Sequence, residues 1–396
     1  MTQGERFHSI DVLKGVMVLF MLFVTSLCLP DILPFFSESG STSHNYELSV
    51  WAVSGFIFMF GMTVPFNITK KINNGLSSYE ISRGIISKSL ILITIGILMV
   101  NTHRVNTDLT GFDGYIWATV MFCAIFLVWL RYPDEENKFF TVTGLRLLGM
   151  ALLVFLIFKF RSGTFENGGS LMTGWWEVPG LLGWGYLIGA FTYLAFRNSF
   201  AGTVVIWLLF LLLNIALKAG MTNFLDPFRP FVGPITDGFV PFIILSGHLT
   251  SLILKKYSEN EFKKTATGLA LYGTTSLITG IILKQTVFSS QKYFNPAMSF
   301  IINGVIVIVF LLFHWLVDTK NYSRWFGFFK RAGENYLTAY LFPYLIYSLL
   351  WLCGVPVFFF RQSGTSLINI IGSGVIAGLL MFLSTIVIKM NIRLKI

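Results

Sequence analysis

Apolar runs of about 20 residues recur along the whole chain, and they restrict its fold more than any other feature. Of the 396 residues, 54% are hydrophobic and 12% are charged, whereas a soluble domain carries about 25% charged residues. A run of about 20 apolar residues can cross a bilayer as a helix, and a helix satisfies its own backbone hydrogen bonds in lipid. The sequence therefore predicts an all-α, polytopic helical membrane protein, with residues 1–396 as a single integral-membrane domain.

The positions of these runs predict about 11–12 transmembrane helices in a single bundle. The predicted spans lie near residues 10–30, 50–69, 84–102, 114–131, 141–160, 179–197, 201–219, 238–254, 266–285, 297–317, 334–353 and 368–388. Proline lacks a backbone N–H and commonly breaks helices, so three of the spans are expected to be interrupted, at Pro65, Pro241 and Pro343. The spacings Gly185-xxx-Gly189 and Gly374-xxx-Gly378 predict helix-packing faces.

Basic residues gather in alternate loops between the spans. If the N-terminus is cytoplasmic, the inner loops hold most of the 29 Lys and Arg residues. This asymmetry follows the positive-inside rule and predicts a multi-pass protein of the cytoplasmic (inner) membrane with both termini in the cytoplasm. Because the net charge of +10 is thereby a topology signal, we expect membrane lipids as partners and no nucleic acid.

The predicted outer segment 31–49 carries the leading catalytic candidate, His44, together with Glu47. A His titrates near neutrality and can act as a general base or accept an acyl group. The alternative is a loop His that contacts only water or lipid headgroups. Loops of this length are often functional, so we take His44 as a candidate base or acyl acceptor.

Two further outer positions carry charged groups. His103 and Arg104 end the third span, where they can hold an anionic or sugar substrate or anchor the helix at the interface. Asp237 stands where the eighth span begins. It can pair with His44 or Arg229, or it can cap the following helix, a role that suits Asp.

Three polar side chains fall within or beside predicted spans. An ionisable group inside a span, as at His248, indicates a functional site, unless the ring bonds a carbonyl of a neighbouring helix. His314 lies within one turn of Asp318, and we expect it to cap or pack locally. Asn335 opens the eleventh span, where it can bond a cofactor amide or join two helices.

Short motifs support a family resemblance. These are Arg6-x-x-Ser9-Ile-Asp11-x-Leu-Lys14-Gly15, then Met21-Leu-Phe-Val, Phe56-Ile-Phe-Met-Phe-Gly61, Trp184-Gly-Tyr and Gly333-Glu-Asn335-Tyr. The chain resembles the heparan-α-glucosaminide N-acetyltransferase family of membrane acyltransferases, in a bacterial branch. The resemblance implies transfer of an acetyl group from cytoplasmic acetyl-CoA to a sugar or amino sugar across the membrane.

The resemblance also implies site residues. The family's active site joins an Asn late in the first span to a His in the first outer loop. Here Thr25 stands at the Asn position and His44 is the loop His, with Asp237 or Glu47 to orient it. The remaining expectations are Lys14, Arg324, Arg331 and Asn335 for the cofactor, since Lys and Arg suit phosphates, and Glu47, His103 and Arg104 for the substrate. We expect no metal.

Two alternatives for the function stay open. The number of spans also fits a transporter of a sugar or other small solute, although such folds are commonly built from internal repeats and none is evident here. The chain can equally be a catalytically inactive relative of the acyltransferases. Its oligomeric state is undetermined, with a homodimer as one expectation.

Overall fold

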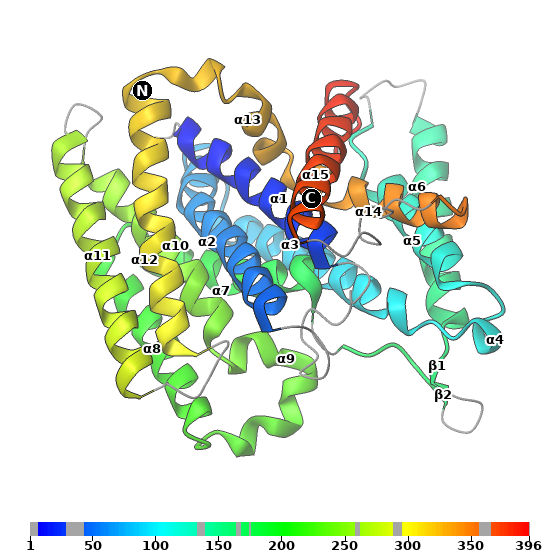
Figure 1. Ribbon diagram of the computed structural model, residues 1–396, viewed down its shortest axis with the longest axis horizontal. Helices are drawn as coiled ribbons and strands as arrows, with labels where there is room; N and C mark the ends of the chain where they lie inside the picture. Colours follow the sequence, from blue (N-terminus) through cyan, green and yellow to red (C-terminus); the bar gives the residue numbers. More distant parts are fainter. Residues whose placement is uncertain are drawn as a thin grey trace.

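The fold of the chain is described by a computed structural model for residues 7–28, 43–132, 139–163, 168–173, 176–257, 262–287, 295–355 and 366–395 (Figure 1). Ten helical segments in these ranges are long and apolar enough to cross a membrane, and two apolar helices are shorter. Each of the twelve predicted spans overlaps one of these segments. The prediction of an all-α, multi-pass helical bundle is therefore confirmed.

The long helices follow the predicted order. They are α1 (His8–Cys28), α2 (Ser43–Asn73), α3 (Ser78–Asn101), α5 (Gly114–Trp129), α6 (Phe139–Lys159), α7 (Glu177–Phe196), α8 (Phe200–Lys218), α10 (Phe239–Lys256), α11 (Phe262–Thr286), α12 (Pro296–Phe313), α14 (Tyr336–Leu352) and α15 (Ser366–Lys389). The shorter helices are α4 (Thr107–Thr110), α9 (Arg229–Thr236) and α13 (Gly327–Glu334). Two-residue strands, β1 (Ser162–Gly163) and β2 (Gly168–Gly169), pair antiparallel.

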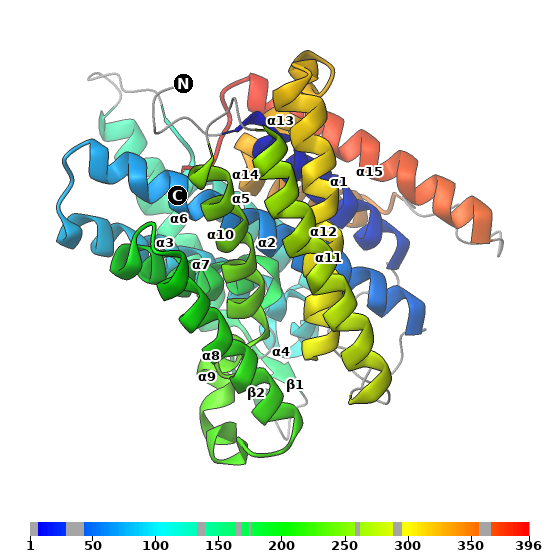
Figure 2. The same ribbon diagram turned by 90° about the vertical axis from the view of Figure 1, so that its left-hand side faces the viewer.

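The short elements mark the two ends of the bundle. In both views α9 and the β1–β2 pair lie at one end, and α13 lies at the opposite end (Figures 1 and 2). Counting the loops from a cytoplasmic N-terminus makes residues 161–178 and 219–237, which contain the strands and α9, outer segments, and makes the loop that contains α13 an inner one. The two ends thus separate as this alternation requires, and a cytoplasmic location of the α13 end stays a prediction.

The centre of the bundle is α10, which is buried along almost its whole length and packs against α2, α7 and α8. Its contact with α2 depends on two glycines. A Cβ at Gly61 would lie 2.1 Å from the carbonyl oxygen of Ile244, and a Cβ at Gly247 would lie 2.1 Å from that of Phe58. Only glycine lets two helix backbones approach this closely.

The outer surface of the bundle is apolar. The pairs α5–α6 and α11–α12 stand at opposite sides of Figure 1, and each pair is in contact. Helices α6, α8, α11 and α15 expose many large apolar side chains, among them Phe158, Leu212 and Leu271. In a bilayer these side chains meet acyl chains, so their exposure is consistent with a membrane-spanning bundle.

The expected interruptions at proline do not occur. Pro65 and Pro343 lie inside α2 and α14, and Pro241 lies in the first turn of α10, where its missing N–H has no partner to lose. In α2, neighbours bind the carbonyl of Pro65: the Thr69 hydroxyl donates to it at 2.6 Å and the Lys255 ammonium at 3.1 Å.

The real interruption in the eleventh span lies at Asn335. Its backbone, with φ −115° and ψ 42°, is not helical and separates α13 from α14.

The predicted glycine faces differ from one another. Gly185 and Gly189 pack against Ile244 of α10, as expected. A Cβ at Gly374 or Gly378 would have no described atom within 4 Å, so these two glycines form no packing face within the described parts of the chain.

Candidate functional site

Helix α12 ends in a single π-helical segment, His314–Thr319, that carries a histidine–aspartate pair. Nδ1 of His314 lies 2.9 Å from Oδ2 of Asp318. The Asp318 carboxylate also accepts from the backbone N–H of Ser9, at 3.3 and 3.4 Å. Ser9 lies in the first turn of α1, where free N–H groups favour a negative charge. A backbone N–H at the start of α1 thus positions the Asp318 carboxylate, and this carboxylate positions the His314 ring.

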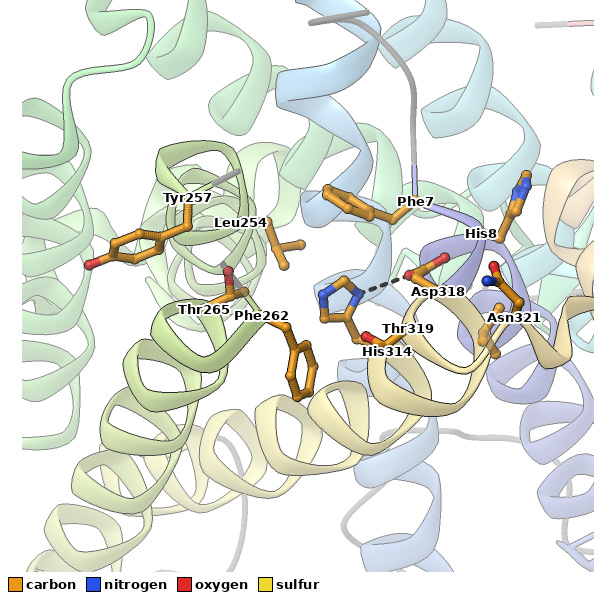
Figure 3. A pocket seen from close by; sticks show the side chains of 11 residues that line it. Phe7, His8, Leu254, Tyr257, Phe262, Thr265, His314, Asp318, Thr319 and Asn321 are labelled. Atoms are coloured by element: carbon orange, nitrogen blue, oxygen red, sulfur yellow. Dashed lines mark hydrogen bonds and ion pairs between the residues drawn. The ribbon is translucent and has the colours of Figure 1, made fainter. Parts of the chain in front are cut away.

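Aromatic rings surround this imidazole. His314 is only 6% exposed, and its ring centroid lies 5.2 Å from that of Phe7, 5.8 Å from that of Phe262 and 5.9 Å from that of Phe310. An ionised carboxylate only accepts, so the contact with Asp318 favours a proton on Nδ1. Nε2 then presents its lone pair, and Figure 3 shows it on the side facing Leu254 and Thr265.

A pocket of about 320 Å³ opens beside this pair (Figure 3). Its lining comes from the start of α1, the end of α10, the start of α11 and the end of α12, and consists of Phe7, His8, Leu254, Tyr257, Phe262, Thr265, His314, Val317, Asp318, Thr319 and Asn321. The size is at the lower limit of small-molecule sites, about 300–1,000 Å³, and the mixture of apolar walls with a few polar groups is typical of them.

Several lysines lie at the ends of the helices that form the pocket. Lys255 and Lys256 end α10, Lys263 and Lys264 lie in the first turn of α11, and Lys320 follows the π-helical segment. Together they give this end of the bundle a positive potential, which attracts an anionic ligand.

The pair has the geometry of a general base or nucleophile. A histidine held at Nδ1 by a carboxylate, with Nε2 free toward a pocket, is the arrangement that serves proton abstraction and acyl transfer. A π-helical turn often marks such a site. From the sequence, only local capping or packing is predicted for His314, since the pocket depends on α1, α10 and α11. The His-x-x-x-Asp spacing was the one local signal.

Of the predicted catalytic residues, Asp237 does not line this pocket. His44 and Glu47 lie in the first two turns of α2, which begins seven residues before the predicted span, and their side chains lie outside the described residues. Asp237 ends α9, with Oδ1 3.6 Å from Nε of Arg229, so the predicted pairing with Arg229 is confirmed. The cap interpretation is wrong, because Gly238 holds the N-cap position of α10.

The predicted cofactor-binding residues lie around α13. Lys14 is only 2% exposed, with its ammonium 3.5 Å from the carboxylate of Asp11 and 5.1 Å from the ring centre of Tyr336. Arg324 is exposed and Arg331 is half-buried. The amide of Asn335 donates to the carbonyl of Arg331 at 3.1 Å. Lys14 therefore lies inside the bundle, and cofactor binding by these four residues stays a prediction.

The predicted substrate residues at the end of α3 differ in their surroundings. His103 is exposed. Arg104 donates to the amide oxygen of Asn101 at 3.0 Å and to the hydroxyl of Ser162 at 3.4 Å. Arg104 thus ties α3 to β1, and its role toward a substrate is untested.

His248 lies in the core of α10 and is completely buried. Neither ring nitrogen has a hydrogen-bond partner among the described residues, so the predicted bond to a helix carbonyl is absent there. Its ring centroid lies 5.3 Å from that of Tyr193.

Within the described ranges, no three His, Cys, Asp or Glu side chains gather closely enough to hold a metal ion. No protein-family model matches the chain, and no curated protein matches it in sequence. The function is therefore argued from the site itself and from the short motifs of the sequence.

Proposed function

We propose that this multi-span membrane protein is an acyltransferase. It takes an acetyl group from acetyl-CoA at the α13 end of the bundle, the cytoplasmic end by charge, and passes it to a sugar or amino sugar on the other side. The observation that carries the proposal is the His314–Asp318 pair, whose Nε2 faces a pocket at the lysine-rich end. The family-like first span supports the same reaction.

The pocket suits one part of the donor. A cavity of about 320 Å³ accommodates the acetyl-thioester end of the molecule and leaves the nucleotide outside. The phosphates then meet the exposed Lys256, Lys263 and Lys320, because ammonium groups bind phosphate as point charges. Phe7 and Phe262 provide an apolar wall for the methyl and methylene groups.

His314 performs the first chemical step. Its Nε2 attacks the thioester carbonyl carbon, the carbon–sulfur bond breaks, and the thiolate leaves and takes a proton from water. Asp318 stabilises the resulting acetyl-imidazolium through the Nδ1–H bond, as a carboxylate does for a catalytic histidine. The acetyl group must then travel through the helix bundle to its outer end, where His44 at the start of α2 is the acceptor that the sequence suggests.

Release of CoA from acetyl-CoA tests the proposal. Purified protein in detergent is incubated with radiolabelled acetyl-CoA and glucosamine, and free thiol and labelled sugar are measured. We expect His314→Ala to abolish CoA release and Asp318→Asn to slow it by about 10²–10⁴-fold. Glu334→Gln is the control, since Glu334 is exposed and does not line the pocket.

Two results decide against the proposal. One is wild-type protein that neither binds acetyl-CoA nor releases CoA with any amino-sugar acceptor. The other is a His314→Ala variant that melts at the wild-type temperature and keeps the wild-type rate. Uptake of labelled sugar into liposomes without consumption of acetyl-CoA would instead favour the transporter.

A further inference from the structure

A cluster of hydroxyl groups lies at the other end of α1, far along the helix from the pocket. The hydroxyls of Thr25 and Tyr344 are hydrogen-bonded at 3.4 Å, and those of Tyr344 and Tyr340 at 3.1 Å. Next to them, the hydroxyls of Ser26 and Tyr347 are 2.7 Å apart. Thr25 and Ser26 are buried. The cluster joins the end of α1 to α14 through polar groups in an otherwise apolar region.

A second buried polar group begins α7. Glu177, the first residue of that helix, is 8% exposed. Its Oε2 has no hydrogen-bond partner among the described residues. Its backbone has φ +45°, an unfavourable value for a residue with a Cβ. The fold thus holds this carboxylate inside the bundle in a strained position.

Two indole groups beside Glu177 are similarly unsatisfied. Trp176 and Trp184 pack edge to face with ring centroids 5.5 Å apart. Neither indole N–H has an acceptor within the described ranges.

A buried carboxylate oxygen without a partner costs several kcal/mol. Since structural strain and lost hydrogen bonds persist where they serve function, these groups indicate a polar ligand. An incoming molecule that carries N–H or O–H donors together with acceptor oxygens satisfies both the carboxylate and the indoles. A sugar or amino sugar carries both kinds of group.

We propose that Glu177 is the base that serves the acceptor. This inference rests on the proposed acyltransferase function. Oε2 accepts a hydrogen bond from the attacking amine or hydroxyl of the acceptor. As the nitrogen or oxygen bonds to the acetyl carbon, the bond from that carbon to the acyl carrier breaks and the proton passes to Oε2. The hydroxyl cluster of Thr25, Tyr344 and Tyr340 includes the position where the family resemblance places an active-site residue.

The reaction has two steps, acetylation of the protein with release of CoA and transfer of the acetyl group to the sugar. The first step tests the proposed function, and the second tests the role of Glu177. For Glu177→Gln we expect wild-type release of CoA and wild-type acetyl labelling of the protein in the absence of acceptor. With glucosamine, transfer to the sugar falls by about 10²–10⁴-fold, the usual contribution of a general base. Raising the pH restores part of the rate, because a deprotonated amine no longer needs the base. Glu334→Gln, which changes an exposed carboxylate, is the matched control.

The possible outcomes are distinct. If wild-type protein releases no CoA, the proposed function fails. If CoA is released and Glu177→Gln transfers acetyl groups at the wild-type rate with the wild-type pH profile, only the assignment of Glu177 fails. Should Glu177→Gln not fold, wild-type protein is treated with a carbodiimide and Glu177 modification is measured by mass spectrometry. Glucose, which carries the sugar hydroxyls but no amine that could capture the activated carboxyl, is expected to slow the modification, and no protection overturns the assignment.

Discussion

Gly333→Ala tests the close contact between α13 and α1. A Cβ at Gly333 would lie 1.8 Å from the carbonyl oxygen of Asp11, whereas ordinary van der Waals contact begins at 3.4 Å. The helices must therefore separate by about 1.6 Å, or α13 must rotate. The obstacle is a backbone atom, which cannot move aside as a flexible side chain can. We therefore expect a loss of stability near the upper end of the range for overpacked cores, about 3 kcal/mol.

The net effect includes a gain in helix propensity. Ala is favoured over Gly inside a helix by about 1 kcal/mol, which leaves a destabilisation of about 2 kcal/mol. The control is Gly327→Ala in the same helix, where a Cβ would have no heavy atom within 4 Å and where we expect no loss. Thermal unfolding of both variants in one detergent, followed by tryptophan fluorescence, measures the difference. A Gly333→Ala protein that melts at or above Gly327→Ala would refute the α1–α13 contact.

Three other substitutions probe separate contacts, each by thermal unfolding in the same detergent. Gly61→Ala brings a Cβ within 2.1 Å of the α10 backbone and should cost about 2 kcal/mol; Gly144→Ala, with open space around it, should cost nothing, and equal losses would contradict the reasoning. Asp11→Ala removes the carboxylate that pairs with buried Lys14 and should destabilise by about 3 kcal/mol; an unchanged melting temperature would rule out a structural role for the pair. Arg104→Ala loses two side-chain bonds and should cost about 1 kcal/mol, and a larger loss than for Asp11→Ala would reverse the expected order.

The positions of the helices are a local property, and the amino-acid sequence alone predicts them. In lipid a backbone must satisfy its own hydrogen bonds, so any sufficiently long apolar run becomes a helix. Local reasoning erred at proline because a helix that is packed on several sides can continue through the loss of one backbone hydrogen bond. Pro65, for example, lies inside α2, which packs against both α10 and α1.

The chemistry of the site is a property of helix packing, and only the tertiary structure decided it. His314 and Asp318 are four residues apart, but their pocket needs Phe7 of α1, Leu254 of α10 and Thr265 of α11. Lys14, which the sequence suggests for cofactor phosphates, is enclosed because α13 packs over α1 through glycine.

Glu177 follows the same principle. The sequence places it at the end of a loop, and its burial depends on the packing of α7 against α3 and α2. The hydropathy of a segment depends only on residues within one helix length, so the positions of the helices can be predicted from the sequence. Which polar groups meet inside the bundle depends on contacts between helices, and these are set by the shapes of many side chains at once.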